Sequence, residues 1–172
     1  KPVRIGNAAS DQFQLDVYGE VMDSLHVARR IGVEPDPDAW ALELALMEAL
    51  ESRWREPDEG IWEVRGPRRH FTHSKIMAWV AFDVGVRAVE QQGLPGDVET
   101  WRACREQVRQ AILRDGFDRE RRCFTRAFGS AAPQRMGLGF ARGPPGCEVR
   151  MMCFDFAATG GIHPRPVESA KR

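Results

Sequence analysis

The spacing of apolar residues predicts four consecutive helices in the first 116 residues. In each stretch the apolar side chains recur at intervals of three and four, which places them on one face of an α-helix. The first stripe consists of Phe13, Val17, Val21, Leu25, Ala28 and Ile31, and the second of Trp40, Leu44, Met47, Leu50 and Trp54. Alanines and leucines widen the second stripe, and residues 74–92 are apolar around most of their circumference. We therefore expect the second and third helices to be covered on most sides, and the first to bury its stripe.

Capping and stop residues separate these stretches. Asp36 and Asp97 stand where an N-cap is expected, and Gly32, Gly93 and Gly116 follow the ends of apolar stripes. Four helices joined mostly by short turns are typical of antiparallel helical hairpins, so the fold class is all-α. Alternation in residues 123–128 adds one short extended segment.

Composition divides the chain near residue 130. Residues 131–172 contain five of the 11 prolines and six of the 16 glycines, and carry six basic against three acidic residues. The whole chain has 25 basic and 25 acidic residues and a net charge of zero, so the first 130 residues carry −3. We expect a helical domain over 1–130 and a Pro/Gly/Arg-rich irregular tail over 131–172. The alternatives for the tail are a shifted reading frame in a GC-rich gene and a natural basic tail.

Charge, hydropathy and cysteine content exclude several classes of function. A neutral chain has no overall field to attract nucleic acid or an anionic membrane. No apolar run approaches the roughly 20 residues that a membrane-spanning helix needs. Four cysteines without C-x-x-C spacing favour a reducing compartment, so we expect a cytoplasmic location. The sequence begins at Lys1 rather than Met, so we expect it to continue a longer chain or to follow processing.

The connection between the second and third predicted helices, residues 54–71, concentrates the candidate chemistry. It holds four carboxylates, four arginines, a histidine and two tryptophans, and long loops on rigid helices often carry functional groups. Glu63 lies among apolar neighbours, a setting that raises a carboxyl pKa and suits a general acid. Trp62 beside it offers a flat face to a sugar ring. The alternative is a solvated loop whose arginines pair with its acids or bind phosphate.

Four blocks of sequence carry the most specific signal. They are R-I-G-N-A-A (4–9), Q-F-Q-L-D-V-Y-G-E (12–20), W-R-E-P-D-E-G-I-W-E-V-R-G (54–66) and F-T-H-S-K-I-M-A-W (71–79). Together they closely resemble glycoside hydrolase family 15, the glucoamylase-like family, and in particular its bacterial branch, which includes trehalases. The resemblance covers residues 1 to about 130.

This resemblance implies a segment of an (α/α)6 barrel of the six-hairpin glycosidase type, with a sugar pocket formed by the loops at one end. It also implies an inverting, exo-acting α-glucosidase of glucoamylase type, acting on maltooligosaccharides or starch-like glucans, with trehalase as the alternative. The family's general acid falls on Glu63, and the pocket-lining Trp and the residue before it fall on Trp62 and Ile61. Val64 stands where fungal glucoamylases carry a second Glu, so their substrate preference does not transfer.

Further site residues are expected in the first and third helices. Tyr18 is expected to support the sugar site, and His73 and Lys75 either face the pocket or cap a helix. No cofactor is expected, and no metal, because the histidines lack completing ligands at metal-site spacing. The family's catalytic base lies in a later loop that no segment of this chain resembles, so we expect the isolated chain to be inactive. A non-catalytic helical interaction domain is the alternative from another class, although no fixed repeat supports it.

Overall fold

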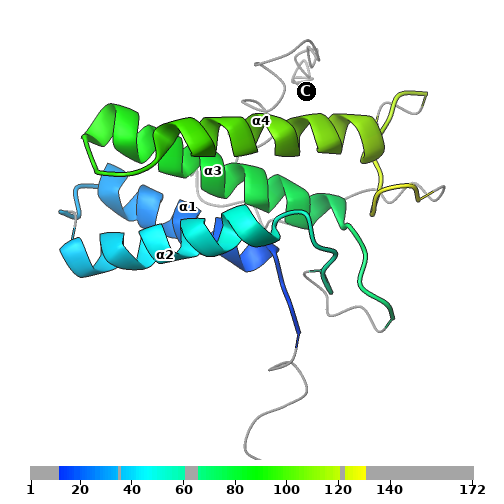
Figure 1. Ribbon diagram of the computed structural model, residues 1–172, viewed down its shortest axis with the longest axis horizontal. Coiled ribbons are helices and arrows are strands. Elements are labelled where there is room, and N and C mark those ends of the chain that lie inside the picture. The colour runs from blue at the N-terminus through cyan, green and yellow to red at the C-terminus, as the bar shows by residue number, and fades with distance from the viewer. Residues whose placement is uncertain (1–11, 35, 61–65, 121–122, 131–172) are drawn as a thin grey trace, which may run out of the picture. The chain divides into compact units, whose positions relative to one another are not determined.

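The computed structural model describes residues 12–34, 36–60, 66–120 and 123–130, and these form four helices and a two-stranded hairpin (Figure 1). The helices are α1 (Asp16–Arg30), α2 (Pro37–Arg53), α3 (Thr72–Gln92) and α4 (Val98–Asp115). β1 (Phe117–Asp118) pairs antiparallel with β2 (Cys123–Phe124). The all-α class and the order of the four helices are confirmed. The expected tail, residues 131–172, lies outside the described residues, so the domain boundary stays a prediction.

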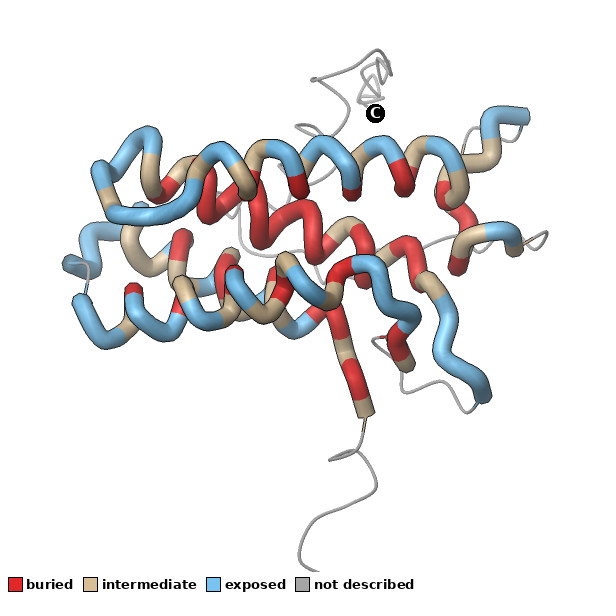
Figure 2. The backbone as a smooth tube through the Cα atoms, in the orientation of Figure 1, coloured by how far each residue is buried: buried red, intermediate tan, exposed pale blue. Residues whose placement is uncertain are grey.

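Helix α3 forms the centre of the described helices and packs against both α1 and α4 (Figure 2). Fourteen of its 21 residues are buried, as its apolar circumference predicts. Gly93 ends it in the left-handed conformation, with φ of 71°, which glycine adopts without steric cost. A buried core helix of this kind gives its first turn, next to the candidate loop, a fixed position.

The face of α1 that the sequence predicts to be buried is wrong, although Phe13, which precedes the helix, is buried as expected. Val17 is 46% exposed and Ile31, just after the helix, is 77% exposed, whereas the buried residues of α1 are Asp16, Gly19, Met22 and His26. Gly19 explains the difference: a β-carbon built on it would lie 2.3 Å from the carbonyl oxygen of Met77 in α3. The missing side chain lets α1 approach α3 along the face that carries Asp16, Gly19, Met22 and His26 instead of along the predicted apolar stripe.

Helix α2 begins as the sequence predicts. The Asp36 carboxylate accepts a hydrogen bond from the Asp38 amide at 2.9 Å, and Pro37 occupies the first turn. Trp40, Met47 and Leu50 of its stripe are buried. The expectation that α2 is covered on most sides is wrong within the described structure, because Leu42 on the opposite face is 54% exposed.

Helix α4 has the expected cap and the expected face. Asp97 accepts from the Thr100 amide at 3.1 Å, and Trp101, Cys104, Val108 and Ala111 are buried. Asp83 of α3 bridges to Arg105 of α4 at 2.8 Å and to Arg87 of its own helix at 2.8 Å. In the described part of the chain, no helix is both long and apolar enough to cross a bilayer.

Candidate functional site

The loop between α2 and α3 carries the predicted catalytic group, and the structure describes both of its arms. Ile61, Trp62 and Glu63, with residues 64 and 65, lie outside the described residues. Residues 54–60 form the first arm and residues 66–71 the second. The site is therefore described by the contacts that hold the two arms on either side of the candidate acid in the sequence.

Asp58 holds the first arm from inside the protein. Its side chain is fully buried, and its Oδ2 accepts hydrogen bonds from the amides of Leu15 and Gly60, both at 3.2 Å. One carboxylate oxygen thus joins the segment that leads into α1 to the last described residue before the candidate acid. A buried carboxylate that accepts two backbone donors is expensive to replace by an apolar side chain, since both amides would lose their partner.

Glu59 and Phe13 make a second connection to the same segment. The amide of Phe13 donates to Glu59 Oε2 at 2.7 Å, and the amide of Glu59 donates to the carbonyl of Phe13 at 3.0 Å. Arg68 of the second arm pairs with Glu59 Oε1 at 2.8 Å. The guanidinium of Arg53 lies 3.7 Å from the centroid of the Phe13 ring. The expectation that arginines of this loop pair with its acids is met for Arg68.

Backbone pairing joins the two arms and fixes the second one. The amides of Asp58 and Arg69 each donate to the other's carbonyl at 2.9 Å. The amide of Phe128 donates to the carbonyl of His70 at 2.9 Å, and the amide of Thr72 donates to the carbonyl of Arg126 at 3.0 Å. Backbone hydrogen bonds therefore hold both arms that flank the segment containing Glu63.

Gly60 is the last residue of the first arm. Its φ is 72°, and a β-carbon built on it would lie 2.7 Å from the ring of Phe71. Both the left-handed backbone and the contact with the ring exclude a side chain here. This glycine is consequently part of the geometry of the loop and not a source of freedom within it.

Lys75 lies on the first turn of α3 and is only 2% exposed. Its Nζ donates to the carbonyls of Trp54 and Glu56, at 2.5 and 2.7 Å. These carbonyls follow the C-terminal end of α2, where backbone oxygens lack helical partners and a cation is favourable. Of the two roles that the sequence left open for Lys75, this geometry favours the capping one over a contact with sugar.

The side chain of Lys75 has a lowered pKa. Burial lowers its pKa from 10.5 to about 8, although the carboxylates of Asp58 and Glu56 favour the charged form; His70, whose own pKa burial lowers, also lies within its electrostatic reach. Because the folded pKa is below the unfolded one, the unfolded chain binds more protons above pH 8, and stability rises with pH there. We expect the free energy of unfolding to rise by about 1 kcal/mol between pH 8 and pH 9 relative to Lys75→Met.

Urea unfolding of both chains at pH 7, 8 and 9 measures this difference. Subtracting the Lys75→Met values removes the contribution of titrating groups that Lys75 does not affect, including the Cys104 thiol, whose pKa burial raises. A difference that stays constant from pH 8 to pH 9 would show that Lys75 titrates normally, and a difference that falls would show a raised pKa; either result contradicts this prediction.

Asp16 and His73 lie near one another at the N-terminal ends of α1 and α3. Asp16 is 4% exposed, and burial raises its pKa against the opposing effect of its backbone hydrogen bond and of His73. Within the described residues, Asp16 Oδ1 and His73 Nδ1 are buried without a hydrogen-bond partner. Asp16 does not belong to the apolar stripe predicted for the first helix, so the sequence did not predict its burial. The pocket-facing or capping role of His73 stays a prediction.

Two residues of this region escaped the sequence interpretation. The sequence suggested Asp58 only as a partner of arginines. Nothing in the spacing of the loop residues predicts a buried carboxylate that accepts hydrogen bonds from two amides. The signal for Asp16 was the glycine three residues later, because Gly19 identifies the face of α1 that approaches α3. Tyr18 is half-buried in the first turn of α1, and its expected role at the sugar site stays a prediction.

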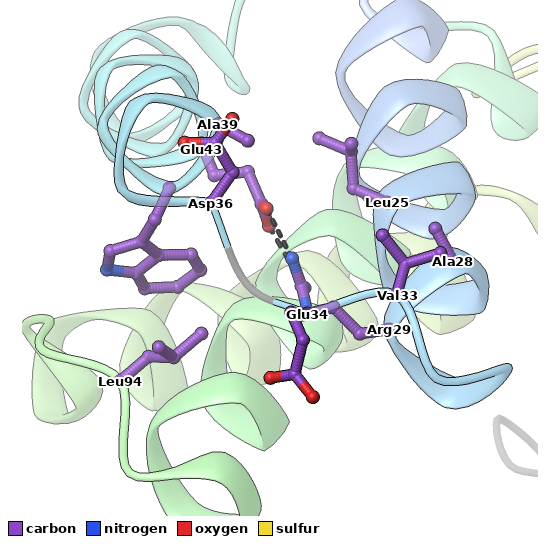
Figure 3. A pocket seen from close by; sticks show the side chains of 10 residues that line it. Leu25, Ala28, Arg29, Val33, Glu34, Asp36, Ala39, Glu43 and Leu94 are labelled. Atoms are coloured by element: carbon purple, nitrogen blue, oxygen red, sulfur yellow. Dashed lines mark hydrogen bonds and ion pairs between the residues drawn. The ribbon is translucent and has the colours of Figure 1, made fainter.

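A small hollow of about 70 Å³ lies where α1 turns into α2, away from this loop (Figure 3). Leu25, Ala28, Val33 and Leu94 contribute to its walls, and Arg29 pairs with the buried Glu43 beside it. Among the described residues no group of three or more His, Cys, Asp or Glu side chains could hold a metal ion. The candidate chemistry of the described residues therefore remains in the loop between α2 and α3.

Comparison with known proteins identifies the family. The profile described as glycosyl hydrolases family 15 matches residues 1–144. The trehalase of Mycobacterium tuberculosis (strain ATCC 25618 / H37Rv) is 40% identical over 132 residues, and that of Mycolicibacterium smegmatis (strain ATCC 700084 / mc(2)155) is 44% identical over 135 residues. Each alignment covers 77% of this chain. The chain belongs to glycosyl hydrolase family 15, and the family expected from the sequence is confirmed.

The coverage of the relatives is partial. The chain spans 19% of the Mycobacterium tuberculosis trehalase, 20% of the Mycolicibacterium smegmatis one and 21% of the trehalase of Thermoplasma volcanium, which is 32% identical over 130 residues. A solved glycosidase in complex with glucose matches 75% of this chain and 34% of its own, with a TM-score of 0.60 and 18% identity. That likeness concerns the fold alone, and it agrees with a segment of an (α/α)6 barrel.

Proposed function

We propose that this chain supplies the general acid, Glu63, of an inverting α-glucosidic hydrolase whose substrate is trehalose. The observation that carries the proposal is the loop of residues 54–71: the two arms that flank the residue matching the family's acid in the sequence are held by hydrogen bonds, several of them buried. Family membership supports a glycoside hydrolase as the parent protein. The trehalase names of the relatives favour trehalose over the maltooligosaccharides of the glucoamylase interpretation, which was our first expectation.

The reaction needs two carboxyl groups about 6.5–9.5 Å apart on opposite faces of the sugar. Glu63, protonated, gives its proton to the glycosidic oxygen while the bond from that oxygen to the anomeric carbon breaks. A base outside this chain takes a proton from the water whose oxygen bonds to the same carbon. The sum is one trehalose and one water giving two glucose molecules. In this proposal Trp62 and the backbone of Ile61 border the sugar, Tyr18 supports the sugar site, and His73 faces the pocket.

Initial rates of glucose release test the substrate. We expect the complete parent enzyme to hydrolyse trehalose at a kcat/KM at least tenfold above those for maltose and a longer maltooligosaccharide. A hydrolase that binds both rings of trehalose loses part of that binding with a differently linked disaccharide, and each 1.4 kcal/mol changes the ratio tenfold. Faster release from the maltooligosaccharide would restore the glucoamylase interpretation instead.

The same assay addresses the remaining expectations. The isolated 172-residue chain should show no turnover, because it holds no carboxylate that resembles the family's base. Complete inactivity of the parent protein on all three sugars would favour the non-catalytic helical domain. We also propose a cytoplasmic location and no cofactor, on the grounds given by the sequence; in the described part of the chain Cys104 and Cys123 are free thiols.

A further inference from the structure

Two buried charged residues hold the arm of the loop that leads to Glu63, from two different elements. Lys75 approaches it from α3 and binds the carbonyls of Trp54 and Glu56. Asp58, within the arm, binds the amides of Leu15 and Gly60. The four bonded backbone groups span residues 54 to 60 and the entrance to α1, so the arm has few positions left in which it can move.

We propose that Lys75 and Asp58 are positioning residues, whose hydrogen bonds to the backbone at Trp54, Glu56, Gly60 and Leu15 set the place from which the segment carrying Glu63 continues. This inference rests on the proposed function, because it assigns the two residues to the aim of the general acid. Neither residue contacts the sugar in this proposal. Each acts through the backbone of the loop.

The burial of the two groups is the first argument. Lys75 is 2% exposed and Asp58 is fully buried, and charged side chains are almost never buried so completely unless they are paired. The structure gives both of them backbone partners, in the loop and at the entrance to α1. Among the described residues, Asp58 Oδ1 has no hydrogen-bond partner, so Oδ2 makes both of the bonds of this carboxylate to the backbone. Lys75 has two donors engaged with two carbonyls, an arrangement that the neutral amine can also satisfy.

The covalent distance to the acid is the second argument. Gly60, which Asp58 binds, is three residues before Glu63, and the ring of Phe71 leaves no room for a side chain on it. A general acid has to lie within hydrogen-bond reach of the glycosidic oxygen, and a displacement of about 1 Å can lower the rate about 10²-fold. Loss of either anchor is therefore expected to impair protonation of the leaving group more than binding of the sugar.

Comparison of two substrates separates this role from a merely structural one. The glucose that leaves trehalose needs a proton, whereas the fluoride that leaves α-glucosyl fluoride needs little help from an acid. We expect Lys75→Met in the complete enzyme to lower kcat for trehalose about 10²-fold, and kcat for the fluoride less than about tenfold. The ratio of the two rates does not depend on the fraction of enzyme that is folded, so partial unfolding cannot imitate the result.

Asp58 provides a conservative pair of variants. In Asp58→Asn the amide oxygen can take the place of Oδ2 and keep both backbone bonds, while Asp58→Leu fills similar space without an acceptor. We expect a near wild-type ratio of trehalose to fluoride hydrolysis for Asp58→Asn and a fall of about 10²-fold for Asp58→Leu. The matched control is Glu43→Gln. Glu43 is a fully buried carboxylate that lies eleven residues before Trp54 and pairs with Arg29. The ratio of trehalose to fluoride hydrolysis in this variant should stay at the wild-type value.

Glu63→Gln distinguishes the failure of this inference from the failure of the proposed function. If Glu63→Gln loses trehalose and fluoride hydrolysis equally, the acid assignment itself is wrong. If Glu63→Gln loses trehalose selectively while Lys75→Met and Asp58→Leu lose both substrates equally, or neither, the positioning role is overturned and the acid assignment stands. Selective loss of trehalose in all three variants supports both.

Discussion

Replacing Glu63 by Gln should lower kcat for trehalose by about 10²–10⁴-fold in the complete enzyme, with little change in KM. The amide keeps the size of the side chain and removes the proton that the leaving glucose needs, and general acid catalysis contributes a factor of this size. A loss confined to kcat indicates an interaction made in the transition state and not in the bound substrate. Initial rates over a range of trehalose concentrations measure both constants.

A carboxylate on α2 serves as the control for this prediction. Glu48 is exposed on α2, and Glu48→Gln makes the same substitution at a position to which the account assigns no function. Its kcat should equal that of the wild type. Full activity of Glu63→Gln would remove Glu63 from the acid role.

Replacing Gly19 by Ala should destabilise the fold by about 3 kcal/mol, the largest effect that we expect from a single methyl group. The added β-carbon would lie 2.3 Å from the carbonyl oxygen and 2.7 Å from the carbonyl carbon of Met77. These are backbone atoms of a buried helix, so α1 and α3 have to move apart to relieve the overlap. The gain of roughly 1 kcal/mol in helix propensity that alanine brings is smaller than this cost.

Gly85 offers a matched control within α3. A β-carbon there would lie 2.8 Å from the terminal methyl of Met47 and 3.1 Å from the ring of Trp101. The end of a methionine side chain can rotate away, so Gly85→Ala should cost less than Gly19→Ala. Urea unfolding followed by circular dichroism compares the two variants. Equal stability of wild type and Gly19→Ala would mean that α1 and α3 do not meet at this glycine.

The helices could be predicted from the sequence because their evidence is local. Asp36 with Pro37 and the cap Asp97 stand at the beginnings that the structure has, and Gly93 stands at an end. The face of α1 could not be predicted in the same way. An apolar stripe identifies a helix, but which side is buried depends on the partner, and Gly19 lets α3 approach a face that carries Asp16 and His26.

The candidate site also contains residues that the sequence could predict and residues that it could not. The residues that carry the resemblance, Glu63 and Trp62, stand next to each other in the sequence and could be named from it. The residues that hold their loop could not, because Lys75 reaches back 19 and 21 residues to its carbonyls and Asp58 reaches back 43 residues to Leu15. Contacts of this range follow from the packing of α1, α2 and α3 and leave no periodic trace in the sequence.

The anomeric form of the first glucose released tests the central claim, an inverting α-glucosidic hydrolase acting on trehalose, most directly. Proton NMR during the first turnovers of the complete enzyme follows α- and β-glucose before they interconvert. Inversion at one ring and release of the other unchanged predict equal amounts of α- and β-glucose. Release of α-glucose alone would indicate retention, and would contradict the account of Glu63 as one of two carboxyl groups that act on opposite faces of the sugar.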